Sequence, residues 1–210
     1  MNIIAVANQK GGVGKTTTVV NLGAALARKG KSVLCIDFDP QANLTNYVAG
    51  CEPRENSIAS VMRAAVLFQP ADIRETIYHS ERFGFDFIPS DLRLSEADIY
   101  LATAMSRETV LRTYLNEIKR QYDYILVDCS PSLGMLTLNA LTAADRVIIP
   151  VQSHYLPVKG LEQLLRTVSK VQRQLNSNLK ISGILITMTE SRTNFSKEIS
   201  QLVRNAYGKA

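Results

Sequence analysis

The 210-residue sequence predicts an α/β fold, with a doubly wound, mostly parallel sheet and helices on both faces. Three observations support this prediction. Short apolar segments alternate with segments of helical periodicity, which is typical of parallel strands joined by crossover helices. A glycine-rich stretch follows the first apolar segment, and aspartates follow two of the others. Because ligands of such sheets bind at the carboxyl ends of the strands, these residues predict a ligand site at that edge.

The individual elements can be predicted from the same periodicity. A helix is expected over 16–28, directly after the glycine-rich stretch. A second should start after Ser106, which can cap it, and end near residue 120, and a third should span about 161–175. The pattern over 50–69 is less regular and predicts short helices and loops. The expected strands are 2–7, 32–37, 85–89, 124–128, 146–151 and 181–187.

The glycine-rich stretch has the context of a phosphate-binding loop, namely strand, turn and helix. Its glycines would let successive backbone N–H groups point at phosphate oxygens. Lys15 would add a cation at the β- and γ-phosphates, and Thr16 offers a hydroxyl to Mg²⁺. The alternative is a structural turn that happens to be rich in glycine. The candidate nucleotide-binding residues are Lys10, Gly11, Gly12, Val13, Gly14, Lys15, Thr16 and Thr17.

The stretch departs from the usual phosphate loop at its start. Gln9 stands five residues before Gly14, where the usual pattern has a glycine, and the next residue is a second lysine, Lys10. We regard this extra cation at the beginning of the loop as more informative than the match itself.

Two acidic strand ends are the next candidates. Asp37 and Asp39 follow one apolar strand, and Asp128 follows another. A carboxylate in this position, beside a phosphate loop, can hold Mg²⁺ through its water shell, and Asp128 has that role by position. Asp37 and Asp39 point the same way if the strand geometry persists, so one of the two could orient the attacking water, and Asp37 is a weaker candidate for the metal. The alternative is that these aspartates only cap the next helix or turn.

Composition indicates a soluble globular protein, since 46% of the residues are hydrophobic and 20% are charged. No apolar run approaches the roughly 18 residues of a membrane span, and the start does not resemble a secretory signal. Cys35, Cys51 and Cys129 show no metal-ligand spacing, so we expect free thiols in a reducing cytosol.

The net charge of +5 is unevenly distributed. Residues 1–150 carry 15 lysines and arginines against 16 aspartates and glutamates, whereas residues 151–210 carry 9 against 3. A basic excess confined to one part of a chain favours a polyanionic partner, either nucleic acid or, less often, an anionic membrane.

Three segments together resemble the ParA/MinD group of deviant Walker ATPases. They are residues 10–17, Lys-Gly-Gly-Val-Gly-Lys-Thr-Thr; residues 37–41, Asp-Phe-Asp-Pro-Gln; and residues 128–132, Asp-Cys-Ser-Pro-Ser. Residues 39–43 and 139–141 favour the ParA/Soj branch, which partitions chromosomes and plasmids. The resemblance extends from residue 2 to the end of the chain and identifies a P-loop NTPase with a deviant Walker A motif.

The resemblance implies a mechanism in which ATP, with Mg²⁺, closes two subunits into a sandwich dimer. Lys10 would reach the partner's γ-phosphate, while Lys15 would act in its own subunit. Thr16 would bind Mg²⁺, and Asp39 would hold the water. The dimer would bind DNA non-specifically, and a ParB-type activator would stimulate hydrolysis and release. We therefore expect a slow ATPase that is cytoplasmic and nucleoid-associated, with no membrane partner.

The sequence differs from the family pattern in three places. Ala42 stands where the family often has glycine, and Ser130 where it often has proline. Residues 183–194 resemble a late segment of the family, after which the family continues with a strand and further helices. We therefore expect residues 1–210 to form a single ATPase domain that lacks those elements. The helix-turn-helix extension of larger plasmid relatives is also missing, so operator-specific repression is not expected.

Basic side chains form stripes on two predicted helices of the last sixty residues. Arg166, Lys170 and Arg173 fall at positions i, i+4 and i+7 of one helix. Lys197 and Arg204 share the polar face of a final helix. Such stripes can be simply solvated faces, but the regional charge favours phosphate contacts that read no bases. Arg192 matches a family position implicated in DNA binding. The candidate DNA contacts are therefore Arg192, Lys197, Arg204, Arg166, Lys170 and Arg173.

Two other classes of protein remain open. A MinD-like ATPase of membrane surfaces would need a basic amphipathic C-terminal helix, which this sequence does not show. A P-loop metabolic or metallocentre enzyme is the other, of the amidoligase or nitrogenase-iron-protein kind. The three cysteines do not stand where cluster ligands would, and residues specific to amidoligase substrates are not visible.

Overall fold

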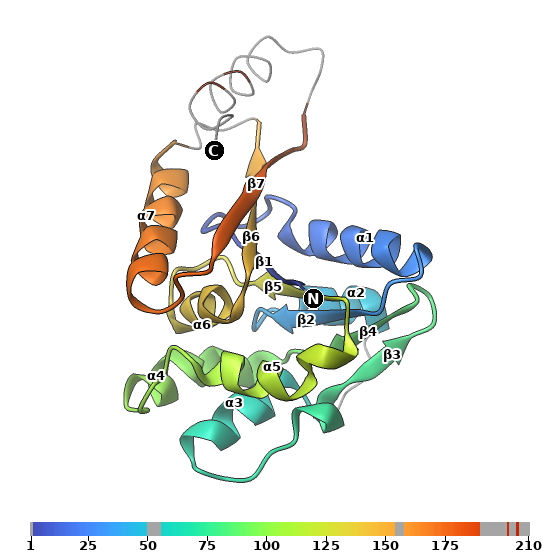
Figure 1. Cartoon of the computed structure of the whole chain (residues 1–210), viewed down its shortest axis with the longest axis vertical. Coiled ribbons are helices and arrows are strands. Elements are labelled where there is room, and N and C mark those ends of the chain that lie inside the picture. Colours follow the sequence, from blue (N-terminus) through green and yellow to red (C-terminus); the bar gives the residue numbers. More distant parts are fainter. Residues whose placement is uncertain (1, 50–55, 154–157, 190–200, 202–204, 206–210) are drawn as a thin grey trace.

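The computed structural model describes residues 2–49, 56–153, 158–189, 201 and 205 (Figure 1). All six expected strands are present, and a short one, β3, was not predicted. Their bounds are β1 Asn2–Val6, β2 Val33–Phe38, β3 Tyr78–Ser80, β4 Phe85–Ile88, β5 Tyr124–Cys129, β6 Arg146–Gln152 and β7 Lys180–Thr187.

The described strands form a single sheet in the order β3-β4-β2-β5-β1-β6-β7. Neighbouring strands pair in parallel, except for β3, which pairs antiparallel with β4 at one edge. The predicted fold class is therefore confirmed. β3 has three residues, too few for an alternating pattern to predict it.

Helices connect the strands. The described α-helices are α1 Lys15–Arg28, α2 Asn43–Ala49, α3 Ile58–Val66, α4 Ala97–Ala102, α5 Val110–Ile118, α6 Met135–Ala143 and α7 Val158–Gln174. Short 3₁₀ helices lie at η1 Ile73–Thr76, η2 Leu92–Glu96 and η3 Lys119–Gln121.

The helices differ from the expectation at Ser106 and in three helices that were not predicted, α2, α4 and α6. The prediction that Ser106 caps a helix was wrong. Ser106 has a φ of 51° and its carbonyl accepts the Thr109 N–H, so a turn comes first and α5 begins at Val110. The sequence also did not predict α6. Most of its residues are buried, so its sequence is apolar on nearly every side and has no amphipathic period.

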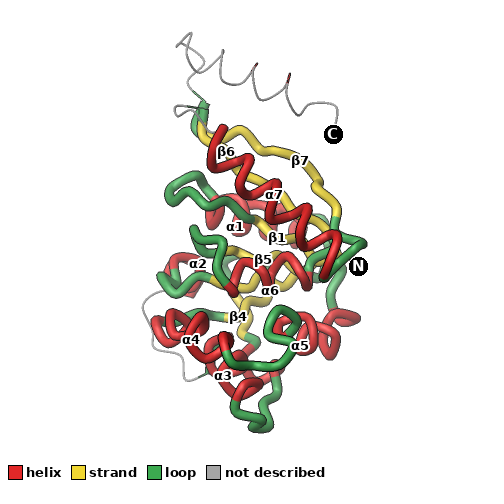
Figure 2. Tube along the Cα trace, turned by 90° about the vertical axis from the view of Figure 1, so that its left-hand side faces the viewer, coloured by secondary structure: helices red, strands yellow, loops and turns green. Residues whose placement is uncertain are grey.

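The sheet separates two hydrophobic clusters, because successive residues of a strand face opposite sides. On one face, Ile4 and Val6 of β1 pack in the same cluster as Val19 and Val20 of α1. On the other face, the cluster joins β1 to helices α3, α4, α5, α6 and α7. Figures 1 and 2 place α7 with β6 and β7 at one end of the molecule and α3, α4 and α5 at the other.

Candidate nucleotide site

The glycine-rich stretch forms the connection between β1 and α1, as predicted. Gly14 is the N-cap residue of α1 and has a φ of 87°, in the left-handed region that favours glycine. Gly12 is also left-handed, with a φ of 70°. The first turn of α1 contains no acidic residue. Its free N–H groups and the positive end of the helix dipole therefore suit an anion.

Lys15 and Lys10 occupy different environments. The side chain of Lys15 is largely buried, and its Nζ donates to the carbonyl oxygen of Lys10 at 3.0 Å. Burial lowers the pKa of Lys15, although the nearby carboxylate of Asp128 opposes this shift. Lys10 is exposed at the start of the loop, and its Nζ donates to Oε1 of Gln152 at 3.2 Å. One lysine thus lies within the loop and the other at its outer side.

Asp128 lies next to the loop and fits a metal. Asp128 is the register partner of Val6 on β1 and of Asp37 on β2, so the three strand ends lie side by side. Its Oδ2 accepts the Thr16 hydroxyl at 2.6 Å, while its Oδ1 is buried without a hydrogen-bond partner. Burial is the main reason why the pKa of Asp128 is raised to about 7. A buried carboxylate oxygen without a partner, beside a hydroxyl, is a donor set that suits Mg²⁺.

Asp37 is engaged by the protein itself. Its Oδ2 accepts both the backbone N–H of Thr45 at 2.8 Å and the Thr45 hydroxyl at 2.7 Å. Its Oδ1 accepts the backbone N–H of Asp39 at 3.3 Å. Burial raises the pKa of Asp37 to about 6, while the hydrogen bonds from Thr45 act in the opposite direction. Asp37 therefore ties the end of β2 to α2, and it remains the weaker metal candidate.

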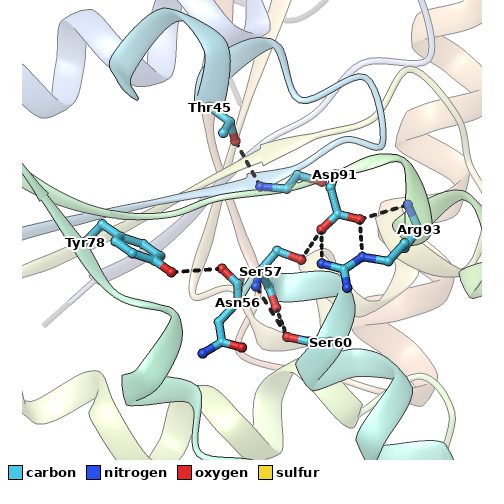
Figure 3. A network of polar contacts seen from close by, with 8 residues as sticks. Thr45, Asn56, Ser57, Ser60, Tyr78, Asp91 and Arg93 are labelled. Carbon is cyan, nitrogen blue, oxygen red and sulfur yellow. Dashed lines mark hydrogen bonds and ion pairs between the residues drawn. The ribbon is translucent and has the colours of Figure 1, made fainter. Parts of the chain in front are cut away.

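The Thr45 hydroxyl extends this connection to a second polar network, shown in Figure 3. It accepts the backbone N–H of Ser90 at 2.9 Å. The next residue, Asp91, accepts hydrogen bonds from Arg93 and from the hydroxyl of Ser57, which precedes α3. The carboxyl ends of β2 and β4 are thus joined by side-chain contacts.

A cavity of about 330 Å³ lies over the loop. It brings together most of the predicted loop residues and Asp39, whose Oδ1 accepts the backbone N–H of Gln41 at 3.0 Å. Its lining also includes residues that the sequence analysis did not select. The cavity is lined by Gly11, Gly12, Gly14, Lys15, Thr16, Thr17, Asp39, Gln41, Asn43, Pro131 and Met188.

Four of these lining residues were missed: Gln41, Asn43, Pro131 and Met188. Each follows the carboxyl end of a strand, so the rule that ligands bind at that edge could have selected the segments. The rule could not select the residues, because loop conformation decides which side chain points into the cavity.

The basic candidates are only partly described. Arg166, Lys170 and Arg173 are exposed on α7, where they line a surface hollow with Thr167 and Ser169. Arg192, Lys197 and Arg204 lie outside the described residues. No helix in the described part of the chain is long and apolar enough to cross a membrane.

A parallel sheet with this loop, a buried lysine and a carboxylate on the adjacent strand defines a P-loop NTPase. A family model described as "AAA domain" matches residues 1–181. Sporulation initiation inhibitor protein Soj of Bacillus subtilis is 47% identical over 207 residues, covering 98% of this chain and 79% of Soj. Chromosome partitioning protein ParA of Caulobacter vibrioides is 41% identical over 211 residues, covering 99% and 77%. The chain therefore belongs to the ParA/Soj family.

The fold is also similar to that of a solved structure that contains a bound nucleotide. Cobyrinic acid a,c-diamide synthase from Mycobacterium smegmatis, with bound ATP analogue and magnesium, aligns with a TM-score of 0.91 and 38% identity. The alignment covers 99% of this chain and 83% of that one.

Proposed function

We propose that this protein is an ATP-dependent molecular switch for DNA segregation. ATP closes two copies into a sandwich dimer, and the dimer binds DNA without sequence preference. A ParB-type activator then stimulates hydrolysis, which releases the DNA. The observation that carries the proposal is the pair of lysines. Lys15 lies inside the phosphate loop, while Lys10 is exposed at its outer side. Membership of the ParA/Soj family supports the same conclusion.

The proposed reaction converts ATP and water to ADP and phosphate. The loop backbone and Lys15 bind the phosphates, and the carboxylate of Asp39 holds the water for attack in line with the γ-phosphate. Thr16 and Asp128 would hold Mg²⁺, and the ion supplies positive charge that offsets the charge on the phosphates. Lys10 of each copy reaches the γ-phosphate bound by the other. Turnover is slow until the activator binds.

The DNA contact is proposed to come from the basic last part of the chain. The exposed stripe Arg166, Lys170 and Arg173 presents three cations on one helix face. Arg192, Lys197 and Arg204 are proposed as further contacts. A protein with this contact would be cytoplasmic and associated with the nucleoid. We further propose that residues 1–210 act as a single ATPase domain.

A metabolic P-loop enzyme is the second candidate, because a solved relative is named a cobyrinic acid a,c-diamide synthase. The partition proteins Soj and ParA have the higher identities, 47% and 41% against 38%. We therefore favour the partition function.

Co-sedimentation with DNA tests the proposal. Binding to DNA of unrelated sequences should require ATP and should weaken steeply between two salt concentrations. Lys15→Ala serves as the control that cannot bind nucleotide, and it should show no ATP-dependent binding. DNA binding that is the same with and without ATP would contradict the switch. A protein that binds ATP but no DNA would favour the metabolic candidate.

A further inference from the structure

The side chain of the last residue of β7, Thr187, is hydrogen-bonded to the phosphate loop. The hydroxyl of Thr187 donates to the carbonyl oxygen of Val13 at 2.8 Å, across 174 positions of sequence. Its methyl carbon lies 3.7 Å from the point that a Cβ on Gly14 would occupy. One side chain from the edge strand of the described sheet is thus hydrogen-bonded to Val13 and would lie against a side chain at Gly14.

The end of β7 is in turn held by Ser153, the residue that follows β6. Ser153 is fully buried, and its backbone N–H donates to the Thr187 carbonyl at 3.3 Å. The Ser153 hydroxyl donates to the carbonyl of Met188 at 3.0 Å. Met188 has a φ of 52°, which is strained for a residue with a side chain, and it lines the nucleotide cavity. Thr187 is therefore anchored on a constrained backbone.

This contact matters because of how a phosphate loop works. In a trans peptide the carbonyl of one residue points opposite to the N–H of the next, so a Gly14 N–H that points into the cavity requires the Val13 carbonyl to point away from it. Val13 is buried, and a buried carbonyl oxygen without a donor is costly. The Thr187 hydroxyl supplies that donor to the Val13 carbonyl. Without it, the loop would gain by turning the Val13 carbonyl toward another donor, which would misalign the N–H groups.

We propose that Thr187 is a positioning residue that holds the phosphate loop in its nucleotide-binding shape before nucleotide arrives, and so sets nucleotide affinity. Thr187 acts through Val13 and Gly14 and has no chemical role of its own. The inference rests on the nucleotide site of the proposed function.

Two substitutions of Thr187 separate the hydroxyl from the shape of the side chain. Thr187→Val removes the donor but keeps the β-branched shape, whereas Thr187→Ser keeps the donor. Titration with a fluorescent ATP analogue should show roughly five- to tenfold weaker binding for Thr187→Val, and binding within about twofold of the parent for Thr187→Ser. Thermal unfolding without nucleotide should change by only about 4 °C or less in either variant.

Several results would overturn the proposal. A Thr187→Val variant that is destabilised yet binds the analogue like the parent would make the contact merely structural. If Thr187→Ser binds the analogue as weakly as Thr187→Val, the hydroxyl donor alone does not set the affinity, and the proposal is wrong. If Thr187→Val fails to fold, Ser153→Ala replaces it. Ser153→Ala removes the hydrogen bond to the Met188 carbonyl and should weaken binding of the ATP analogue about threefold. Unchanged binding of the analogue in this variant would refute the proposal. A parent that binds no analogue, or a Lys15→Ala variant that binds it normally, would instead defeat the nucleotide site itself.

Discussion

Asp39 is the residue on which the proposed hydrolysis depends. Its carboxylate lines the cavity, and the Gln41 N–H fixes the orientation of one of its oxygens. Asp39→Ala should bind ATP with Mg²⁺ like the parent, while phosphate release should slow by roughly a hundredfold or more. Equilibrium binding of a fluorescent ATP analogue and a phosphate-release assay measure the two quantities. Loss of nucleotide binding would instead make Asp39 a direct metal ligand or a structural residue.

Ala42 is one departure from the family pattern, and its backbone conformation shows why glycine is common at this position. Its φ is 53°, in the left-handed region where glycine is preferred, and glycine is what the family often has there. Ala42→Gly should therefore leave stability unchanged or raise it by up to about 1 kcal/mol. Ala25→Gly, at an exposed position within α1, is the matched control and should cost about 1 kcal/mol. Urea unfolding measures the stability of both variants. An equal loss of stability in Ala42→Gly and Ala25→Gly would contradict this explanation.

At the scale of elements, the network around Asp91 fixes the start of α3 to the end of β4 (Figure 3). Burial opposes the charge on Asp91, but hydrogen bonds from Arg93 and Ser57 outweigh it and hold the pKa of Asp91 below its usual range. The resulting stabilisation is complete above the pKa of an unfolded aspartate, about 3.9, and is lost as the pH falls through the lower folded-state pKa.

Asp91→Asn should consequently lower the free energy of unfolding by about 1 kcal/mol at pH 7, because the charged hydrogen bonds are lost. The difference from the parent should shrink as the pH falls below about 4. Urea unfolding at several pH values measures it. Asp72→Asn is the control, since Asp72 forms a similar but exposed pair with Arg74 and should change stability less. A difference that does not depend on pH would refute the role of the charge.

The basic stripe on α7 gives a prediction at the same scale. Arg166→Glu combined with Lys170→Glu should weaken DNA binding about equally for all sequences. The log–log salt dependence should flatten by roughly one unit per lost phosphate contact. Arg63→Glu on α3, at the opposite end of the molecule, is the control and should have little effect (Figure 1). Binding isotherms at several salt concentrations decide, and an unchanged slope would make the stripe only a solvated face.

Local pattern explains which elements the sequence could predict. The phosphate loop and the six longer strands are recognisable because their signals lie in consecutive residues, and Thr16 and Asp128 then meet at the sheet edge as expected. Contacts between distant segments gave no such signal. The bond from Thr187 to Val13 depends on β7 ending beside the loop, and α6 has no amphipathic period because it is buried. Neither the hydrogen bond nor the helix could therefore be predicted from the periodicity of its own segment.

At the scale of the whole molecule, the nucleotide site and the α7 stripe are separate features. Single phosphate contacts are weak, and a second copy doubles their number. Dimer formation can therefore gate DNA affinity without any base contact. Under this account, the nucleotide controls DNA binding by deciding how many copies act together.

The most direct test of this account is the molar mass in solution, measured by light scattering with Asp39→Ala, in which bound ATP should persist. The mass should be that of one chain without nucleotide and should double with ATP and Mg²⁺. Adding Lys10→Ala to that variant should leave ATP binding largely intact and keep the mass at one chain, because Lys10 is proposed to reach the nucleotide of the other copy. A double variant that still doubles its mass with ATP would contradict the cross-subunit role, and an Asp39→Ala variant that binds ATP but stays a single chain would contradict the switch.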